Sequence, residues 1–496
     1  MKYSPIRDPI LNQQALDAQR QIDEVQDVYE RIPQPFKLEA MSDIVTALLF
    51  GVGIKRVPQE MVELSFYDRV VARIHQDELD EAFGHSRFIE DSVLTPAGFG
   101  ITLPLPSDPS VFLDLRSRVR SYLMQKLELP KDAVRVFWLL GQNGPSAFIR
   151  ANIPAHYLES RNIFIDLGSQ FNPEIGDYDV FVFERQYHPV GVEAVKQIQA
   201  AGKIAVFETD DNCLAAPKQL MDAQHFQAQS AISMKNLAAA CNYILVSTEK
   251  LGQQIVEQYS GDKPVQLAVA PNIRVVNNKI DYAIWNEMRT KHWRAHLGTR
   301  VLWAGGAAHG MLDARVFPEV VKHFVNRKAP VTFVLAGIFI EALQNRHDLA
   351  KHVEVHGIVP PSQYPAYVSA LSCDIGIAML DDNEFNLGKS DLKWLEYTAA
   401  GLPTIASNVG PYNVSIYPDI TGLLVQNTVS SWCDAIQKLI DEAELRRKLV
   451  IDARDVQMTT GRDITSEFGL DQWESFFRDI TGIKREGVGG DQDSSV

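Results

Sequence analysis

The sequence predicts an α/β protein with two doubly wound parallel sheets that face each other across a cleft, preceded by a mostly helical region. Short apolar runs alternate with helical patterns over residues 133–273 and again over residues 298–460. Most runs end in a turn signal. A helical, tryptophan-containing connection over residues 282–297 separates the two series. This alternation is typical of parallel sheets whose crossovers are helices.

Residues 1–130 are expected to be a mostly helical accessory region. Within residues 11–32, apolar or small residues recur at alternating spacings of four and three, which indicates a helix with a narrow apolar seam. We expect this helix to lie on its own chain. An intermolecular coiled coil through residues 11–32, and hence a homo-oligomer, is the alternative. Proline-containing loops such as 103–109 interrupt the rest of the region.

Residues 131–280 are expected to form the first α/β domain. A clear helical pattern over residues 190–200 lies between two of its strand candidates. The strand candidates are short and largely apolar, as in sheets covered on both faces. They span residues 134–140, 178–183, 203–207, 243–247 and 265–269.

Residues 298–460 are expected to form the second α/β domain. Its strand candidates span residues 300–303, 331–335, 353–356, 374–378, 404–406 and 422–425. Beyond it, residues 465–482 contain Trp473, Phe476 and Phe477 and predict a helix anchored by aromatic side chains. Residues 484–496 are expected to be a disordered tail.

Composition and charge exclude several classes of protein. The formal net charge of −15 and the lack of a long basic run disfavour nucleic acid and anionic membranes as partners. The four cysteines form no closely spaced pair, which argues against a disulfide framework or a zinc site and favours a reducing cytoplasm. The first residues lack the apolar core of a signal peptide, and the longest apolar stretch, 44–54, is too short to span a bilayer.

The most informative segment runs from Gly388 to Pro403. We expect Ser390 to cap a helix that Gly401 ends, with Leu392 on its buried face. Amide groups at this helix start, together with the ammonium of Lys389, favour an anion such as a diphosphate. One and a half turns further, Glu396 has a carboxylate that could accept two ribose hydroxyls. The alternative is that Lys389, Lys393 and Glu396 are ordinary solvated helix charges.

The stretch 388–407, followed by residues 410–412 and 421–425, resembles the donor-binding region of retaining GT-B glycosyltransferases of group one, particularly bacterial enzymes of surface-polysaccharide synthesis. The resemblance covers both α/β domains and implies the GT-B fold, with residues 465–482 as the helix that crosses back onto the first domain. The family commonly has two glutamates eight positions apart, of which the second binds the ribose. Glu396 matches the second, whereas Gly388 stands at the first, which puts the sugar contacts in doubt.

The resemblance also implies further donor contacts. Gly305 and Gly306 would form the glycine loop at the diphosphate, where His309 could replace a missing basic residue. Gly357 and Ile358 would lie at the nucleobase. Along the phosphate-binding helix, the expected contacts are Gly388, Lys389, Ser390, Asp391 and Leu392, followed by Glu396.

On the acceptor side, the resemblance implies the loop with Asn143 and Gly144, which leads to Arg150. Arg150 could face the donor phosphates or merely cap a helix. Asp210 and Asp211 follow a predicted strand and could orient acceptor hydroxyls, with Asp211 as a catalytic base; a metal is the weaker alternative. His188 could contact the sugar or be an ordinary loop histidine.

The resemblance implies transfer of a sugar from a nucleoside diphosphate sugar to a hydroxyl of a saccharide, lipid-linked glycan or other acceptor, with retention. Lys389, Glu396 and Asp211 are the expected catalytic residues. The nucleotide sugar is a co-substrate, and no separate cofactor or metal is expected. The alternatives are a nucleotide-sugar epimerase, a degenerate nucleotide-sugar-binding or scaffold subunit, and transfer to modified DNA bases, which the acidic charge disfavours.

Overall fold

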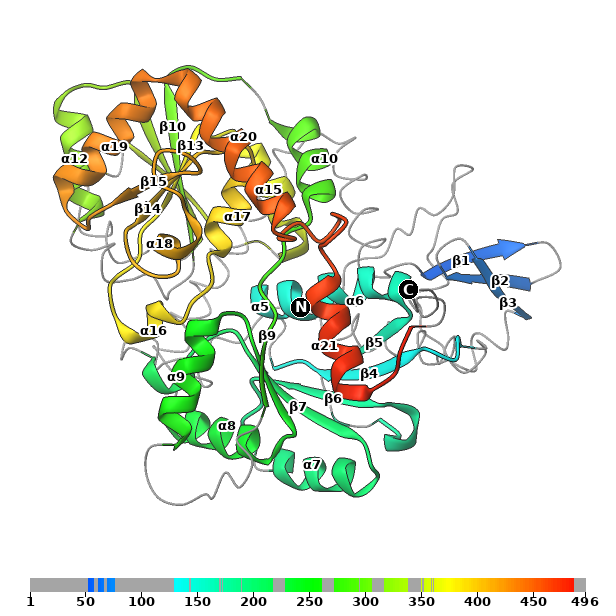
Figure 1. The fold of residues 1–496 in the computed structure, drawn as a ribbon. Coiled ribbons are helices and arrows are strands. Elements are labelled where there is room, and N and C mark those ends of the chain that lie inside the picture. Colours follow the sequence, from blue (N-terminus) through cyan, green and yellow to red (C-terminus); the bar gives the residue numbers. More distant parts are fainter. Residues whose placement is uncertain are drawn as a thin grey trace, which may run out of the picture.

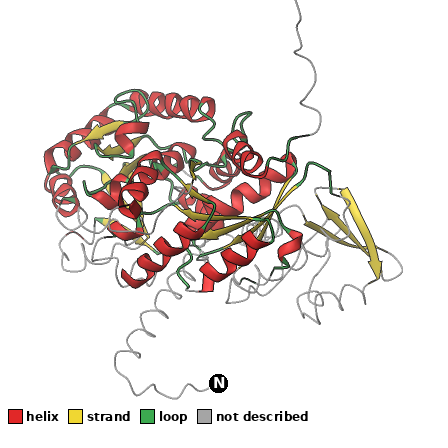
Figure 2. Cartoon of the chain, turned by 60° about the horizontal axis from the view of Figure 1, so that its bottom comes forward, coloured by secondary structure: helices red, strands yellow, loops and turns green. Residues whose placement is uncertain are grey.

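The computed structural model describes residues 52–57, 61–66, 69–75 and 129–485, except 142–143, 169–170, 172, 189, 217–227, 261–271, 294, 306–315, 338–348, 350–351, 358 and 360. Two parallel sheets, each covered by helices, form two α/β domains (Figures 1 and 2). The two-sheet α/β architecture expected from the sequence is confirmed.

The first domain contains a six-stranded parallel sheet with the order β5-β4-β6-β7-β8-β9. Its strands are β4 (Val134–Leu139), β5 (Ile163–Gly168), β6 (Val180–Glu184), β7 (Ile204–Thr209), β8 (Tyr243–Val246) and β9 (Asn272–Val275). Its helices are α5 (Pro145–Ala147), the π-helical η1 (Phe148–Asn152), α6 (Ile153–Leu158), α7 (Val190–Ala200), α8 (Ala228–Ala240) and α9 (Glu249–Ser260); the short 3₁₀ turns are η2 (Glu159–Arg161), η3 (Ile175–Asp177) and η4 (Cys213–Ala215).

Two strands of this sheet were not predicted. In β5 the apolar run is interrupted by Asp166, whose carboxylate is buried and accepts a hydrogen bond from the Tyr178 hydroxyl at 2.8 Å. In β9 the residues are half polar because the strand lies at the edge of the sheet. The strand expected over residues 265–269 lies outside the described residues.

The second domain contains a six-stranded parallel sheet with the order β12-β11-β10-β13-β14-β15. Each of its six predicted strands is present, with small shifts in the bounds. They are β10 (Thr299–Gly305), β11 (Val331–Gly337), β12 (Val353–His356), β13 (Ile375–Ala378), β14 (Thr404–Ser407) and β15 (Leu423–Val425). Helix α10 (Tyr282–His292) leads into the domain, followed by α12 (Phe317–Asn326), η8 (Pro361–Gln363), α15 (Tyr364–Ala370), α16 (Glu384–Leu387), α17 (Leu392–Ala399), α18 (Tyr412–Ser415), α19 (Val429–Asp441) and α20 (Ala443–Thr459).

After α20 the chain returns to the first domain as helix α21 (Asp471–Thr481), drawn in red in Figure 1. Its buried residues Trp473, Phe476, Phe477 and Ile480 belong to the same apolar core as Trp138 of β4. The Trp138 and Trp473 ring centroids are 6.0 Å apart. The two domains are therefore joined twice, by the linker after β9 and by the segment between α20 and α21.

The described part of residues 1–130 is a three-stranded antiparallel sheet, which corrects the expectation of a mostly helical region for these residues. Its strands are β1 (Val52–Val57), β2 (Met61–Phe66) and β3 (Arg69–His75). Apolar and polar residues alternate along β2, and only residues 67–68 separate it from β3, both of which favour a hairpin. The helix and oligomer contact predicted over residues 11–32 lie outside the described residues.

Candidate functional site

Charged side chains from both domains meet at the carboxyl ends of the two sheets. Asp210 and Asp211 follow β7, and Lys389 follows α16 in the other domain. The Lys389 Nζ lies 2.8 Å from Asp211 Oδ1. Arg185, which follows β6, lies 3.5 Å from Asp210 and 3.6 Å from Asp211. Open α/β sheets bind ligands at these strand ends.

Helix α17 begins at Leu392, so Asp391 and not Ser390 is its N-cap residue, which corrects the predicted cap. The Asp391 side chain makes no capping hydrogen bond. It is only 3% exposed, and both of its carboxylate oxygens accept hydrogen bonds from Arg462, one of them at 3.0 Å. The Ser390 hydroxyl accepts a hydrogen bond from Asn278 Nδ2 at 2.8 Å.

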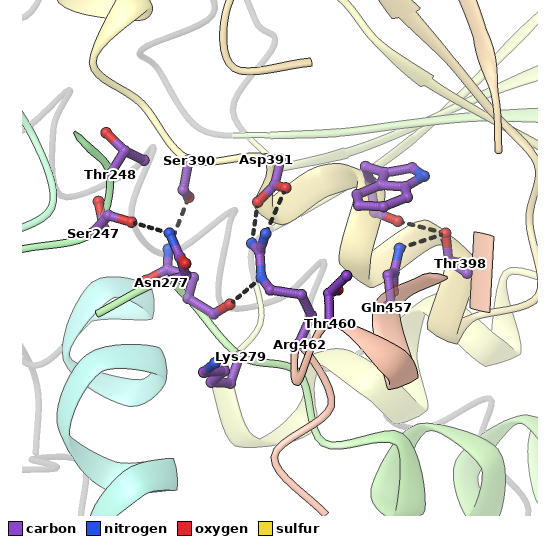
Figure 3. Close-up of polar contacts among 12 residues, drawn as sticks. Ser247, Thr248, Asn277, Lys279, Ser390, Asp391, Thr398, Gln457, Thr460 and Arg462 are labelled. Atoms are coloured by element: carbon purple, nitrogen blue, oxygen red, sulfur yellow. Dashed lines mark hydrogen bonds and ion pairs between the residues drawn. The ribbon is translucent and has the colours of Figure 1, made fainter. Parts of the chain in front are cut away.

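Figure 3 shows that these bonds form one network between the linker, the start of α17 and the segment after α20. The Arg462 Nε also donates to the carbonyl of Asn278 at 3.0 Å, and Asn277 Nδ2 donates to the carbonyl of Ser247 at 3.2 Å. Sequence reasoning missed Asn278 and Arg462. No local pattern marks them, because their partners are distant along the chain.

Gly388 lies where helix α9 of the first domain approaches closely. A Cβ at this position would be 2.4 Å from Gln254 Oε1, and Gln254 is 2% exposed. The carbonyl of Gly388 accepts a hydrogen bond from the Thr248 hydroxyl at 2.8 Å. A glutamate could stand here only if α9 or Gln254 moved.

Glu396 is 6% exposed and lies 2.6 Å from the Lys393 ammonium, so neither is an ordinary solvated helix charge. The Lys393 Nζ also lies 3.2 Å from the Tyr364 hydroxyl and over its ring at 5.0 Å. Burial lowers the pKa of Lys393, but the Glu396 carboxylate and the neighbouring Tyr397 and Tyr412 together raise it above its usual value. The Lys393 ammonium therefore compensates the charge of the Glu396 carboxylate.

Two predicted donor glycines lie at strand ends of the second sheet. Gly305 is the last residue of β10, and Gly357 follows β12 with its carbonyl accepting a hydrogen bond from the Tyr367 hydroxyl at 2.9 Å. The predicted contacts Gly306, His309, Ile358 and, on the acceptor side, Asn143 lie outside the described residues.

Arg150 lies in the interior of the first domain, which corrects its predicted place on the acceptor side. Its guanidinium is fully buried, donates to Glu208 at 2.7 Å and to Asn278 Oδ1 at 3.1 Å, and lies 5.0 Å from the Trp473 ring centroid. Arg150 therefore binds the linker after β9 through Val276 and Asn278. Gly144 is the N-cap of α5 with open space around it, and His188 is exposed beside Tyr187.

Glu184 and Glu208 are two fully buried carboxylates that sequence reasoning did not single out as a pair. They are register partners at the ends of β6 and β7. Burial, and then repulsion from Glu208, raises the pKa of Glu184. The sequence feature that could have indicated this pair is an acidic residue at or near the end of each of two apolar strands. Among the residues that the structure describes, no group of three histidine, cysteine or acidic side chains is arranged to hold a metal ion.

Comparisons with known proteins show what the second domain and the whole fold are similar to. Residues 298–442 match a family model described as glycosyl transferases group 1. No curated protein matches the chain by sequence. The structure of sucrose-phosphate synthase from Thermosynechococcus elongatus matches with a TM-score of 0.51 and 14% identity, over 71% of this chain and 100% of its own. This likeness confirms the GT-B fold.

Two further structures match over a similar part of the chain. Anabaena HepE in complex with UDP and glucose has a TM-score of 0.49 and 13% identity, over 70% of this chain and 100% of its own. A glycosyltransferase from Rickettsia africae has a TM-score of 0.48 and 12% identity, over 70% of this chain and 98% of its own. In the described part of the chain, every helix is too short or too polar to cross a membrane.

Proposed function

We propose that the chain transfers a sugar from a nucleoside diphosphate sugar to an acceptor hydroxyl, with retention. Residues 298–442 match the family model of group 1 glycosyl transferases, and the chain has a GT-B fold. The acceptor would be a saccharide, a lipid-linked glycan or another hydroxyl compound. The observation that carries the proposal is the segment just before α17, where Lys389 pairs with Asp211 of the other domain, a carboxylate that Arg185 also contacts.

In this proposal the donor diphosphate lies at the start of α17. The amide groups there and the Lys389 ammonium stabilise the charge that grows on the diphosphate as the glycosidic bond breaks. Glu396, held by Lys393, accepts the ribose hydroxyls. Gly305 gives the diphosphate close access to bare backbone, and Gly357 lies at the nucleobase. The nucleotide sugar is a co-substrate, and the chemistry assigned to these residues requires no further cofactor.

Asp210 and Asp211 are proposed to act on the acceptor. In the structure the Lys389 ammonium is paired with the Asp211 carboxylate, so a binding diphosphate would compete with Asp211 for this ammonium. Once Lys389 turns to the diphosphate, Asp211 is available to accept a proton from the acceptor hydroxyl. Arg185 keeps both aspartates at the end of β7 during this exchange.

The test is calorimetric binding of UDP, GDP, ADP, CMP and dTDP sugars to the wild type, Lys389→Ala and Glu396→Gln. We expect one nucleotide to bind, with affinity reduced in both variants. Lys438→Ala is the control, since Lys438 pairs with Asp419 at 2.8 Å on an exposed surface. Failure of every donor to bind the wild type would refute the proposal. The products of a binding donor, analysed with an acceptor panel, then show the transfer and its stereochemistry.

A catalytically degenerate, nucleotide-sugar-binding subunit is the second candidate. Gly388 favours it, because no carboxylate stands at the position where the resembling family has its first glutamate, and Gln254 occupies the adjacent space. Donor binding without turnover over a broad acceptor panel would support this candidate. Turnover of donor without any acceptor other than water would instead indicate an epimerase or a hydrolase.

A further inference from the structure

Helix α16 belongs to the second domain along the chain, but its aromatic residue is part of the first domain's core. Phe385 is 1% exposed and packs in the cluster that contains Leu251 and Ile255 of α9 and Cys213. Figure 1 shows α16, in yellow, beside α9 on the side of the molecule away from α21. The domains are therefore also in contact at a point away from the linker and the crossover helix.

One face of α9 makes the polar part of this contact. Gln254 Nε2 donates to the carbonyl of Glu384 at 2.7 Å, and Gln258 Nε2 donates to the Glu384 carboxylate at 2.8 Å. Leu251, Gln254 and Gln258 follow helical spacing and so lie on one side of the helix. Gln254 is in turn held by Asn212, whose amide donates to Gln254 Oε1 at 3.2 Å. Asn212 directly follows Asp211, so the contact reaches the acceptor-side aspartates.

The other end of α16 leads directly into the proposed diphosphate site. Gly388 is the C-cap residue of α16, and its carbonyl accepts the Thr248 hydroxyl. The amide of Lys389 donates to the carbonyl of Asn386 at 3.2 Å. The Lys389 ammonium also lies 4.4 Å from the centroid of the Phe385 ring. The Phe385 ring, which anchors α16 in the first domain, therefore also contacts the Lys389 ammonium that is proposed to bind the diphosphate.

We propose that α16 is a peg through which the first domain positions the diphosphate-binding residues of the second. Phe385 and Gln254 are positioning residues: they touch neither donor nor acceptor, and they act by fixing the backbone of residues 388–391 and the ammonium of Lys389. The donor site is complete only while the peg is docked on α9. The donor part of this inference rests on the proposed function.

The first experiment is a double-mutant cycle on donor affinity with Phe385→Ala and Lys389→Ala. We expect Phe385→Ala to raise the donor Kd at least tenfold in the wild type and less than threefold in Lys389→Ala. Equal effects in both backgrounds would mean that Phe385 does not act through Lys389 and would overturn its proposed role in placing the ammonium. Phe385→Leu keeps the apolar anchor but removes the aromatic ring beside Lys389, and it provides the same cycle if Phe385→Ala does not fold.

A second set of variants leaves the core intact. Gln258→Glu places a carboxylate opposite Glu384 and should raise the donor Kd at least threefold, and adding Glu384→Gln should restore it because an amide again faces a carboxylate. Gln253→Glu, the same change on an exposed part of α9, is the matched control. A donor Kd unchanged by Gln258→Glu, or changed equally by Gln253→Glu, would contradict a docked peg.

Amide hydrogen exchange separates this inference from the proposed function, because it requires no donor. In Gln258→Glu and Phe385→Ala, exchange should accelerate at residues 384–392 and stay unchanged in β13 and β14. Uniform acceleration over the whole second domain, or no acceleration, would overturn the proposal that docking of α16 on α9 fixes residues 388–391. A wild-type chain that binds no donor would refute the proposed function, while the exchange pattern would still decide whether the first domain fixes residues 388–391.

Discussion

Lys389 forms an ion pair between the two domains, since its ammonium contacts the carboxylate of Asp211 in the other domain. Both partners are partly shielded from solvent, with 17% and 15% of their side chains exposed. A pair of this kind is worth about 1 kcal/mol. In the proposed function, a donor diphosphate must overcome this amount when it takes the ammonium from Asp211.

We therefore expect Asp211→Asn to tighten donor binding about fivefold, the equivalent of about 1 kcal/mol. The same variant should transfer more slowly, because an amide cannot accept the acceptor's proton. Calorimetry and a turnover assay measure the two effects. Asp419→Asn makes the same change in an exposed ion pair and should alter neither. Weaker donor binding in Asp211→Asn would contradict competition for Lys389.

The buried carboxyl group of Glu184 is expected to make the stability of the protein depend on pH. Burial and Glu208 raise its pKa above the unfolded value of 4.5. Above about pH 4.5 the unfolded chain releases this proton while the native chain keeps it, so stability falls as pH rises. Glu184→Gln keeps an acceptor for Trp138 Nε1, and its free energy of unfolding should gain on that of the wild type between about pH 5 and pH 8. Urea denaturation at both pH values tests this, and a constant difference would show that Glu184 is ionised in the native state.

At the scale of elements, helix α17 holds together the two strands β10 and β13, next to the proposed donor site. Strands β10 and β13 pair only at Val301 with Ile375 and at Leu302 with Gly376. Beyond these pairs the Tyr397 hydroxyl bridges them: it accepts from the amide of Ala304 at 3.0 Å and donates to the carbonyl of Ile377 at 3.1 Å. One side chain thus replaces the missing backbone bonds beside Gly305.

Tyr397→Phe should lower the free energy of unfolding by about 1–3 kcal/mol, because it leaves a buried amide and a buried carbonyl without this partner. Urea denaturation measures the loss. Tyr417→Phe, the same change at a residue that is 56% exposed, should be nearly neutral. Equal stabilities of the two variants would mean that Ala304 and Ile377 find other partners.

The strands of the second domain could be predicted because each is apolar and followed by a turn signal. Strand β5 was missed because Asp166 interrupts its apolar run, and the pairing that buries this carboxylate, with Tyr178, depends on tertiary structure. The start of α17 was misplaced by one residue for a related reason. Ser390 has the better capping side chain, but its hydroxyl is used by Asn278.

The candidate site was predictable where its chemistry is local to one segment. Gly388, Lys389 and Glu396 were proposed because helix start, cation and carboxylate follow each other in one stretch that also resembles a known donor-binding region. Arg462 could not be found, because its partner Asp391 is 71 positions away. Arg150 was misplaced because its strand-loop-helix context gave no indication that its guanidinium would turn inward to Glu208.

At the scale of the whole molecule, a buried lysine lies where the linker meets the returning chain. Lys279 Nζ donates to the carbonyl of Gly461 at 2.6 Å and to Gln472 Oε1 at 2.9 Å. Burial, and then the positive charges of Arg462 and Arg150, lowers the pKa of Lys279 to about 7. The stability of the junction between the domains is therefore expected to depend on pH.

Between about pH 7 and the unfolded value of 10.5, the unfolded chain holds the Lys279 proton and the native chain does not. The contribution of Lys279 to stability therefore rises with pH in this window, by up to about 1.4 kcal/mol per pH unit. We expect Lys279→Met to remove this slope, so that the wild type gains on the variant between about pH 7 and pH 9. Chemical denaturation at several pH values measures it, and parallel curves would show that the lysine stays charged in the fold.

Helix α21 completes the apolar core of a domain whose first strand, β4, begins at Val134. During synthesis on the ribosome, the first domain must therefore wait for its last structural element until the entire second domain has been translated. The second domain, whose strands and helices are continuous from Thr299 to Thr459, has no such dependence. The segment translated later is thus expected to reach its native state first, and the earlier one to remain a partner for chaperones until Trp473 emerges.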